Sequence, residues 1–341
     1  MDILKISVTL FCLLCCNCLK NQQHEITQPE TPVYTLSGIV RDIDGKEPLV
    51  GIKVFLDSID DYILTDSLGF YKFERMVTVK DHSLNVKRDG YFVVKEKSIV
   101  MSYSDRTIDL EAPKPLIGKV GACFNSARKS GLCWNNQTMA VLEGIPPTEE
   151  NPFYYLTIYK TDDLENYKDH WSLTQSFDED FTANGIINCQ GSYWFLMTGL
   201  FKSVLYEITN NGKFSTTITL PFYATDITWD GSNFWVASGR SKMMKLVNWG
   251  NQVENYFVSG SGTHGIAWDG KHFWTTDIDD NYVCKYDSNF EISATYVPFV
   301  DNQEFVCPII DRLTHIAFDA AGDLWGIDAR SGTEYIFKFD L

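Results

Sequence analysis

The chain has 341 residues, of which 44% are hydrophobic and 14% aromatic, and this content excludes a disordered polymer because it can form at least one large core. Its 45 Asp and Glu residues outnumber 29 Lys and Arg residues, which gives a formal net charge of −16. Such a balance argues against binding nucleic acid phosphates or an anionic lipid surface through bulk charge. The length predicts two domains.

Residues 1–18 predict a signal peptide of the lipoprotein type. A Lys at position 5 precedes an apolar run from Ile6 to Leu14 that is too short to span a bilayer. The run leads into Leu13-Leu14-Cys15-Cys16, which resembles a bacterial lipobox. The resemblance implies acylation of Cys16, with Cys15 and Cys18 as alternatives. The competing interpretation is an ordinary secretory peptide whose cysteines are incidental.

Residues 19–34 are predicted to form a flexible tether, because the segment is polar and Pro29 and Pro32 resist regular structure. A tether behind an acylated cysteine would hold the folded domains outside the cytoplasm, in the cell envelope. We therefore expect a lipid anchor in a bacterial membrane, with the outer membrane favoured.

Five cysteines follow the N-terminal segment: Cys123, Cys133, Cys189, Cys284 and Cys307. An odd number cannot all be paired. Cys123 and Cys133 are spaced to close a small disulfide, and buried free thiols are the alternative. None has the spacing of a metal site, so no zinc site is predicted.

Residues 35–112 predict an antiparallel β-sandwich, because short stretches of alternating apolar residues are separated by turn signals such as Asp44-Gly45 and Gly69. Asp66 is interpreted as a turn carboxylate that caps its own backbone. The motifs Ser37-Gly38, Pro48 to Val54, Thr65 to Phe73 and Lys87 to Tyr91 resemble the carboxypeptidase regulatory-like domain. The resemblance implies a seven-stranded, transthyretin-like sandwich that serves as a folding, adhesion or positioning module and has no catalytic role.

Residues 113–341 contain a repeat. Four segments read as strand, tight turn and strand ending in Trp: 185–195, 226–236, 265–275 and 315–326. Their tryptophans, Trp194, Trp235, Trp274 and Trp325, recur at intervals of about 40 to 50 residues, which is typical of β-propeller blades.

Each repeat continues into a third strand and usually a fourth. A degenerate unit precedes them, with Trp134 in the Trp position, so five blades are expected, with six as the alternative. Because the last repeat ends on its third strand, the segment from Pro115 to Phe124 is predicted to supply the missing outer strand and close the ring. An open array and an eight-stranded sandwich are the other architectures considered. The predicted fold class is all-β.

In a propeller the first strand of each blade begins, and the second ends, at the same mouth of the central channel. Polar residues at these positions are therefore the candidate ligand-binding set: Asn184, Asp226, Arg240, His264, Asp277, His315, Asp328 and Arg330. Such a set could bind a small ligand, hold a divalent cation or supply a general base. The alternative is that these side chains cap backbone groups of neighbouring blades.

The densest acidic cluster, Asp277 to Asn281, is the best candidate for calcium, although no cofactor is required by any pattern and a solvated loop explains it as well. The Asp residues of the two Trp-Asp-Gly turns are interpreted as backbone acceptors. No nucleophile elbow, phosphate loop, HExxH motif or EF-hand is present in the sequence.

Two classes of function remain. The first is a binding or scaffold protein whose propeller face binds a protein, peptide or glycan; the combination of tether, sandwich and repeat resembles lipoproteins of Bacteroidetes. The second is a propeller enzyme such as a hydrolase or lyase. His264 to Trp274 resembles the blade repeat of the five-bladed glutamine cyclotransferases, but no catalytic position of that family can be matched here.

Overall fold

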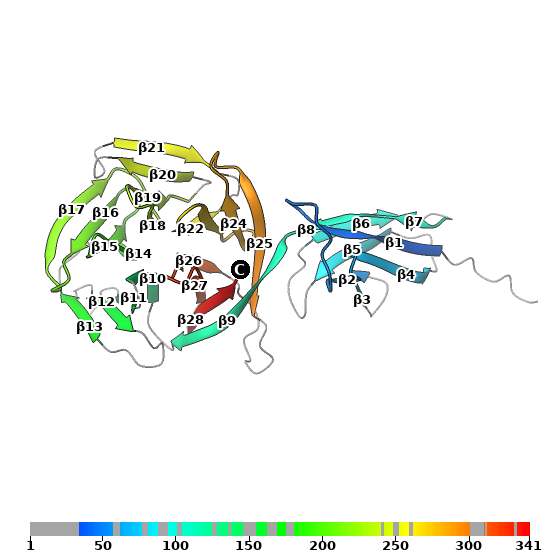
Figure 1. Ribbon diagram of the computed structural model, residues 1–341, viewed down its shortest axis with the longest axis horizontal. Coiled ribbons are helices and arrows are strands. Elements are labelled where there is room, and N and C mark those ends of the chain that lie inside the picture. The colour runs from blue at the N-terminus through cyan, green and yellow to red at the C-terminus, as the bar shows by residue number, and fades with distance from the viewer. Residues whose placement is uncertain are drawn as a thin grey trace, which may run out of the picture.

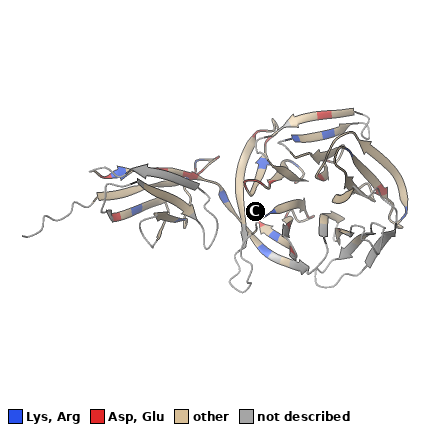
Figure 2. Ribbon diagram, turned by 180° about the vertical axis from the view of Figure 1, so that it is seen from behind, with Lys and Arg blue, Asp and Glu red and all other residues tan. Residues whose placement is uncertain are grey.

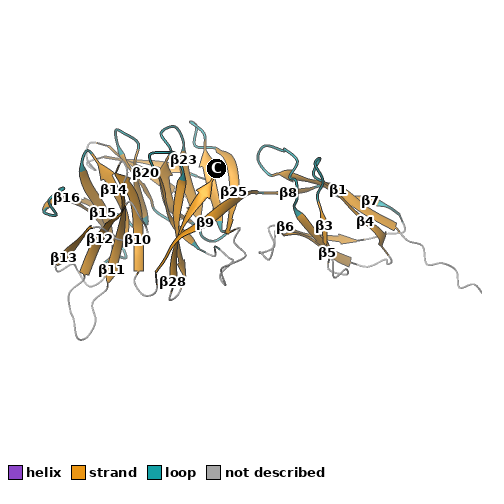
Figure 3. Cartoon of the chain, turned by 60° about the horizontal axis from the view of Figure 1, so that its bottom comes forward, coloured by secondary structure: helices purple, strands orange, loops and turns teal. Residues whose placement is uncertain are grey.

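The structure is a computed structural model of the chain. It describes residues 34–56, 62–76, 81–87, 95–100, 104–124, 128–135, 138–145, 155–161, 169–174, 181–239, 242–247, 252–258, 262–300, 310, 312–330 and 333–341. Every regular element among them is a strand, so the fold is all-β, and this part of the chain contains no helix that could cross a membrane. Two bodies lie side by side along the long axis (Figures 1 and 3).

The first body consists of strands β1–β8: Tyr34–Asp42, Lys53–Leu56, Tyr62–Leu64, Phe70–Met76, Asp81–Lys87, Lys95–Val100, Arg106–Thr107 and Leu110–Ala112. They form two sheets. One has the order β3-β2-β5-β6, and in the other β1 pairs with β4, β7 and β8. Where seven strands are expected, the described residues include eight, because the last segment is divided into the short strands β7 and β8, which both run parallel to β1.

The core of this body follows the period of a strand. In β1 every second residue from Leu36 onward is buried, and it meets buried side chains such as Val54 and Phe73 from other strands of the sandwich. The tight turn before β4 also forms as predicted, since an Asp66 carboxylate oxygen accepts the backbone N–H groups of Leu68 at 2.8 Å and Phe70 at 2.9 Å.

The second body is a ring of sheets, the arrangement of a β-propeller (Figure 1). Three four-stranded sheets comprise β10–β13 (Arg128–Asn135, Thr138–Ile145, Tyr155–Thr161, Asp169–Thr174), β14–β17 (Thr182–Cys189, Ser192–Thr198, Ser203–Ile208, Phe214–Leu220) and β18–β21 (Asp226–Trp229, Phe234–Ala237, Lys242–Val247, Gln252–Phe257). An eight-stranded sheet comprises β22–β25 (Thr263–Trp268, Phe273–Asp277, Tyr282–Tyr286, Ile292–Val300), β26–β28 (Leu313–Phe318, Leu324–Arg330, Thr333–Asp340) and β9 (Lys114–Phe124).

Strand β9 closes the ring, as the sequence predicts. It pairs antiparallel with β28 and supplies the outer strand that the last repeat lacks. On its other side β9 pairs in parallel with β25, the outer strand of the preceding set, and this pairing joins the last two sets into one sheet. The first and last segments of the ring are therefore held by one continuous hydrogen-bonded ladder.

The repeated tryptophans take part in a repeated side-chain contact. The indole N–H of Trp235 donates to Asp230 at 2.6 Å and that of Trp274 donates to Asp269 at 2.8 Å. The same Asp residues also accept backbone N–H groups in their turns, as predicted. A buried indole N–H is thereby satisfied by the turn that connects the first two strands.

The first repeat departs from the predicted register. Trp134 lies at the end of the inner strand β10, in the position of Trp229 and Trp268, and not on the second strand. The second-strand position belongs to Ala140, so the prediction for Trp134 is wrong. The physical reason is that one aromatic residue ends the first strand of a typical repeat and another, such as Trp235 or Trp274, stands near the start of the second strand and not at its end as expected. Only strand pairing distinguishes the two positions.

The two bodies meet at the start of β9. Lys114 forms an ion pair with the buried carboxylate of Asp42 at 3.2 Å, and Asp44 accepts the backbone N–H of Thr295 on β25. The sandwich thus contacts the outer edge of the ring. Figure 2 shows Lys and Arg interspersed with Asp and Glu on the ring strands, without a continuous band of one sign.

Candidate functional site

The centre of the ring is built from five described inner strands that carry equivalent segments of five residues: Ser130–Trp134, Asn184–Asn188, Thr225–Trp229, His264–Trp268 and Thr314–Phe318. Each inner strand contacts the next around the ring. The third residue of every segment is Leu or Ile and is buried. Packing therefore fixes this position, while the other positions are left to differ.

The second residue of each segment lies one position closer than the buried Leu or Ile to the mouth at which the inner strands begin. It is glycine in three segments, namely Gly131, Gly185 and Gly265, and it is Asp226 and His315 in the other two. A Cβ at Gly185 would lie 2.5 Å from an Asp226 carboxylate oxygen, and one at Gly265 would lie 2.9 Å from the Thr314 carbonyl oxygen. Gly185 thus leaves the space that the Asp226 carboxylate occupies, whereas Gly265 allows the neighbouring inner strand to approach closely.

Asp226 is buried and accepts two backbone N–H groups. Oδ1 accepts from Ile227 at 2.9 Å, and Oδ2 accepts from Ile266 on the neighbouring inner strand at 3.0 Å. These bonds compensate for the loss of water around a buried carboxylate. They also fix the carboxylate between the inner strands β18 and β22.

His315 brings a second polar group to the same place. Its Nδ1 lies 3.4 Å from Oδ1 of Asp226, and within the described residues that buried nitrogen has no hydrogen-bond partner. Strand β22 lies between β18 and β26 in the ring (Figure 1), so the contact reaches across the channel. The two side chains together narrow this mouth.

His264 completes the cluster from β22. Its Nδ1 lies 3.0 Å from the Thr314 carbonyl oxygen, which can only accept, so Nδ1 carries the proton and Nε2 is the basic nitrogen. The His264 and His315 rings are perpendicular, with centroids 5.7 Å apart. Burial, together with the neighbouring His315, lowers the pKa of His264 to about 4, so its imidazole is neutral at pH 7.

The structure therefore brings three of the predicted residues together, Asp226, His264 and His315, which are called the mouth cluster below. Asp277 and Asp328 are predicted in the same set but serve the backbone. Asp277 accepts the N–H groups of Asp279 and Asp280, and Asp328 accepts that of Arg312 at 3.1 Å. These two carboxylates cap backbone groups, but of their own repeat and not of a neighbouring blade as the alternative had it.

The remaining predicted site residues, Asn184, Arg240 and Arg330, make no described contact with the mouth cluster. The Asn184 amide donates to the Thr182 hydroxyl at 3.4 Å, outside the mouth cluster. Arg240 lies outside the described residues, as does Cys16, and for Arg330 only the backbone pairing with Thr333 is described. Cys133 is a free, buried thiol and so forms no disulfide with Cys123, and burial raises its pKa.

Sequence reasoning missed Glu143, a buried carboxylate on β11. It lies three residues after Ala140, as Asp277 lies three after Trp274 and Asp328 three after Trp325. A five-way alignment of second strands would have found it. The misplaced Trp134 shifted the first repeat and hid this equivalence, along with the glycine pattern of the inner strands.

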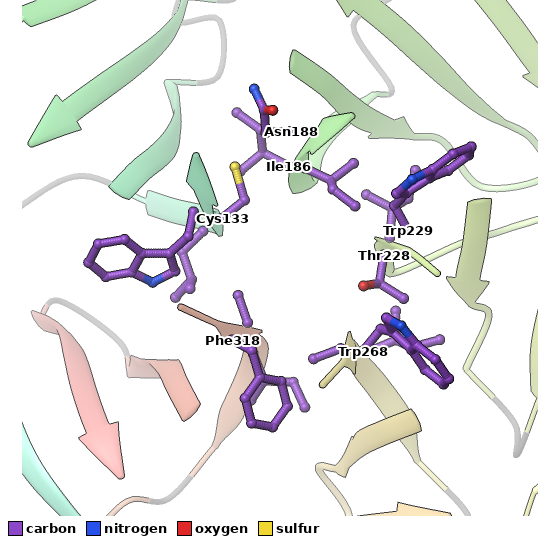
Figure 4. Close-up of a pocket in the computed structure, with 15 residues that line it drawn as sticks. Cys133, Ile186, Asn188, Thr228, Trp229, Trp268 and Phe318 are labelled. Atoms are coloured by element: carbon purple, nitrogen blue, oxygen red, sulfur yellow. The ribbon is translucent and has the colours of Figure 1, made fainter. Parts of the chain in front are cut away.

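Beyond the mouth cluster the channel widens into a cavity of about 150 Å³ lined by the last three residues of each inner-strand segment (Figure 4). Ile227 and Ile316, which follow Asp226 and His315 in the chain, belong to this lining. The cavity thus begins directly beneath the mouth cluster.

The mouth cluster presents a carboxylate, a neutral imidazole with a basic Nε2, and an imidazole beside the carboxylate. This combination can bind a polar group that donates hydrogen bonds, and it can accept a proton. Among the described residues no group of three or more His, Cys, Asp or Glu side chains is arranged to hold a metal ion. The acidic segment from Asp277 to Asn281, named above as the candidate for calcium, is therefore not arranged as such a group.

No protein-family model matches the chain, and no curated protein matches it. Solved structures with some similarity include a glutaminyl cyclase of Myxococcus xanthus, with 10% identity over 67% of this chain and 98% of that one and a TM-score of 0.48. A calcium-binding regucalcin of Agrobacterium tumefaciens has 12% identity over 67% and 97%, with a TM-score of 0.43. A protein of unknown function from Bacteroides caccae has 11% identity over 72% and 78%, with a TM-score of 0.40.

Proposed function

We propose that this chain is a lipid-anchored binding protein of the bacterial cell envelope. In this proposal residues 1–18 are a lipoprotein signal peptide with Cys16 as the acylated residue, and residues 19–34 are the tether. Residues 35–112 are a carboxypeptidase regulatory-like sandwich that positions a five-bladed propeller formed by residues 113–341. The propeller binds a protein, peptide or glycan partner through a polar group that enters the channel mouth.

The convergence of Asp226, His264 and His315 carries this proposal. Three side chains from three successive inner strands meet at one mouth, although two of them are buried and a core position would favour apolar groups. Gly185, at the equivalent position of another segment, leaves room for the Asp226 carboxylate. A cluster that costs desolvation and depends on a glycine beside it is better explained by ligand binding than by folding.

Binding can be tested by thermal shift with a soluble form that starts at residue 21, screened against oligosaccharides, peptides and divalent cations. A ligand at about 100 times its dissociation constant stabilises the folded state by about 2.7 kcal/mol, a shift that is readily measured. We expect His264→Ala and His315→Ala to abolish the shift. His272→Ala is the matched control, because His272 contacts Asp269 in a turn outside the cluster. A shift that all three variants retain would contradict the mouth cluster as the site.

One observation favours a catalytic role as the second candidate. The Asp226 carboxylate lies beside the His315 imidazole, a pairing that can orient an imidazole as a general base, while the neutral His264 can accept a hydrogen bond from a substrate through Nε2. A hydrolase or lyase would turn over a ligand found in the screen. Product formation that His264→Ala and Asp226→Asn abolish would support an enzyme, whereas an unchanged bound ligand would support binding alone.

The membrane anchor needs a separate test in cells. We expect Cys16→Ala to release the protein from the membrane fraction and to remove the mass of the lipid from its N-terminal peptide. A protein that remains membrane-bound and acylated would point to Cys15 or Cys18, and one that is never acylated would favour the ordinary secretory peptide.

A further inference from the structure

Two connections on the mouth side of the ring expose large apolar side chains. The turn between β15 and β16 carries Leu200 and Phe201, which are 74% and 85% exposed, and the connection from β17 to β18 carries Tyr223, which is 44% exposed. These three residues are called the apolar rim below. On the described ring the other exposed large apolar residues are Phe214, where β17 begins, and Leu341, after β28 ends, both on the opposite side. The mouth side therefore carries three of five.

Hydrogen bonds hold the two connections of the apolar rim together. The Thr198 hydroxyl donates to the Ala224 carbonyl oxygen at 2.6 Å, and the Ala224 N–H donates to the Ser203 hydroxyl at 2.9 Å. Thr198 and Ser203 flank the β15–β16 turn, which is closed by a bond from the Gly199 N–H to the Lys202 carbonyl oxygen at 2.9 Å. The backbone that carries the rim is therefore fixed on both sides of the turn.

Turn formation does not explain the residues at the tip of the β15–β16 turn. Tips of tight turns favour Gly, Asn, Asp and Ser, which suit turn conformations and solvent. The equivalent turn between β23 and β24 follows this rule with Asp279 and Asp280, which are both exposed. Leu200 and Phe201 break the rule and gain little burial. Adjoining exposed apolar residues beside a candidate site indicate a surface that contacts a partner.

The apolar rim borders the mouth cluster. Tyr223 lies three positions before Asp226, so their Cα atoms are at most about 11 Å apart. Thr225, next to Asp226, donates its hydroxyl to the His264 carbonyl oxygen at 2.6 Å and thereby joins the Tyr223 connection to β22. A partner that lies on the rim can therefore reach the mouth with one long side chain.

The mouth favours a basic side chain. Asp226 offers a carboxylate and the half-buried His264 a basic Nε2, and both groups accept hydrogen bonds. A second carboxylate lies at the edge, because a Cβ at Gly262, two residues before His264, would be 2.7 Å from Oδ2 of the exposed Asp279. The exposed Arg312 precedes β26, on the other side of β22, so a partner's cation would lie on the side of Asp226 and Asp279. An ammonium or guanidinium group supplies both the donors and the opposite charge.

We propose that the mouth side of the ring binds a protein segment in which a Lys or Arg side chain enters the channel mouth and a large apolar neighbour packs on the apolar rim. This inference deepens the function proposed above and rests on it, because the mouth cluster is the polar half of the site. A neutral glycan brings no charge to Asp279, and an acidic segment is repelled by it. The net charge of −16 attracts a basic partner at longer range.

The test is a peptide array probed with the form that starts at residue 21, which keeps every described strand. The capped heptapeptides have Lys, Arg, Glu or Ser at the centre and every residue type on either side of it. We expect the bound peptides to have a central Lys or Arg beside a large apolar residue, and the tightest of them is then titrated by calorimetry. The proposal is overturned if the folded protein binds no peptide, or if peptides with a central Glu or Ser bind as tightly.

Variants of exposed residues test the two halves of the surface without affecting the fold. Leu200→Ser and Phe201→Ser truncate the rim, and Asp279→Asn removes a charge beside the mouth, so each should weaken the tightest peptide roughly threefold to tenfold. Leu341→Ser and Glu291→Gln are the matched controls, because they remove an exposed apolar side chain and an exposed carboxylate on the opposite side of the ring. Equal affinity in the test variants and the controls would overturn the proposal.

His264→Ala separates this proposal from the function on which it rests. If a ligand from the thermal-shift screen is lost in His264→Ala but unaffected by Phe201→Ser, the mouth binds something other than this segment, and only the present proposal fails. If a peptide is lost in Phe201→Ser but binds unchanged to His264→Ala and Asp226→Asn, no basic side chain enters the mouth. That result would overturn the present proposal and would also leave the mouth cluster without the ligand expected of it.

Discussion

Replacing Gly185 by Ala tests the role of the glycines around the mouth cluster. Gly185 has a φ of +56°, and a Cβ there would lie 2.5 Å from Oδ1 of Asp226 and 3.0 Å from the backbone nitrogen of Ile227. A left-handed backbone costs a residue with a Cβ about 1–2 kcal/mol. Overpacking against fixed atoms adds about 1–3 kcal/mol, and here one contacted atom is backbone. We therefore expect Gly185→Ala to lower the free energy of unfolding by about 2–5 kcal/mol.

Gly231→Ala separates these two costs. Gly231 has a φ of +95°, and no atom lies within 4 Å of a Cβ built there, so its substitution carries only the backbone cost. Denaturant unfolding of both variants should place Gly185→Ala at least 1 kcal/mol below Gly231→Ala, by the lower limit of the overpacking cost. Gly185→Ala should also lose the ligand-induced thermal shift, because Asp226 must move. Equal destabilisation of the two variants, with the shift retained, would refute the idea that glycine creates the space for Asp226.

Three further predictions concern other parts of the molecule. Burial lowers the pKa of His264 to about 4 from an ordinary value near 6.5, so as the pH falls the unfolded chain takes up this proton before the folded chain does. Above pH 6.5 the group does not affect stability, and between pH 6.5 and pH 4 we expect the free energy of unfolding to fall by about 3 kcal/mol. Denaturant midpoints of His264→Gln should not show this loss. Parallel pH profiles would contradict this. Asp269→Ala removes the acceptor of the Trp274 indole and should cost about 1–3 kcal/mol in urea unfolding, and an unchanged midpoint would mean that water replaces the carboxylate. Residues 125–341 lack β9 and should not melt cooperatively, whereas residues 113–341 should; two equal calorimetric transitions would show that the ring does not need this strand.

The ring could be predicted from the sequence because its repeats are stabilised by local contacts. In the units that contain Trp235 and Trp274, the indole N–H on the second strand donates to an Asp in the preceding turn, within six residues. Because this hydrogen bond is local, the residues that form it recur as a pattern in the sequence. The first unit has Ala140 in place of the tryptophan, and without that landmark its register was wrong. Closure by residues 115–124 was predictable for a different reason, since a repeat that ends without its outer strand leaves an unpaired edge.

The mouth cluster could be predicted only in part. Asp226, His264 and His315 begin inner strands, and strand direction alone places them at one mouth. Asp277 and Asp328 satisfy the same rule, yet both carboxylates accept nearby backbone N–H groups. A carboxylate that caps its own loop and one that faces a neighbouring strand differ in position by only a few ångströms. That difference depends on contacts between strands 40 to 100 residues apart, so it cannot be predicted from a local sequence pattern.

The departure from five-fold equivalence explains why the two ends of one channel differ in chemistry. Packing holds the middle position of every inner-strand segment to Leu or Ile, and a substitution there would leave a cavity in the core of the ring. Two other positions are not constrained in this way: the second residue of the segment is Gly, Asp or His, and the fifth is Trp, Phe or Asn. A ring selected for stability alone would repeat the most stabilising residue at each position. Asp226 and His315 bury polar groups where three segments use glycine, and Asn188 places an amide where four segments use an aromatic ring, so the residues that break the repeat are the ones whose variants discriminate most sharply between folding and binding.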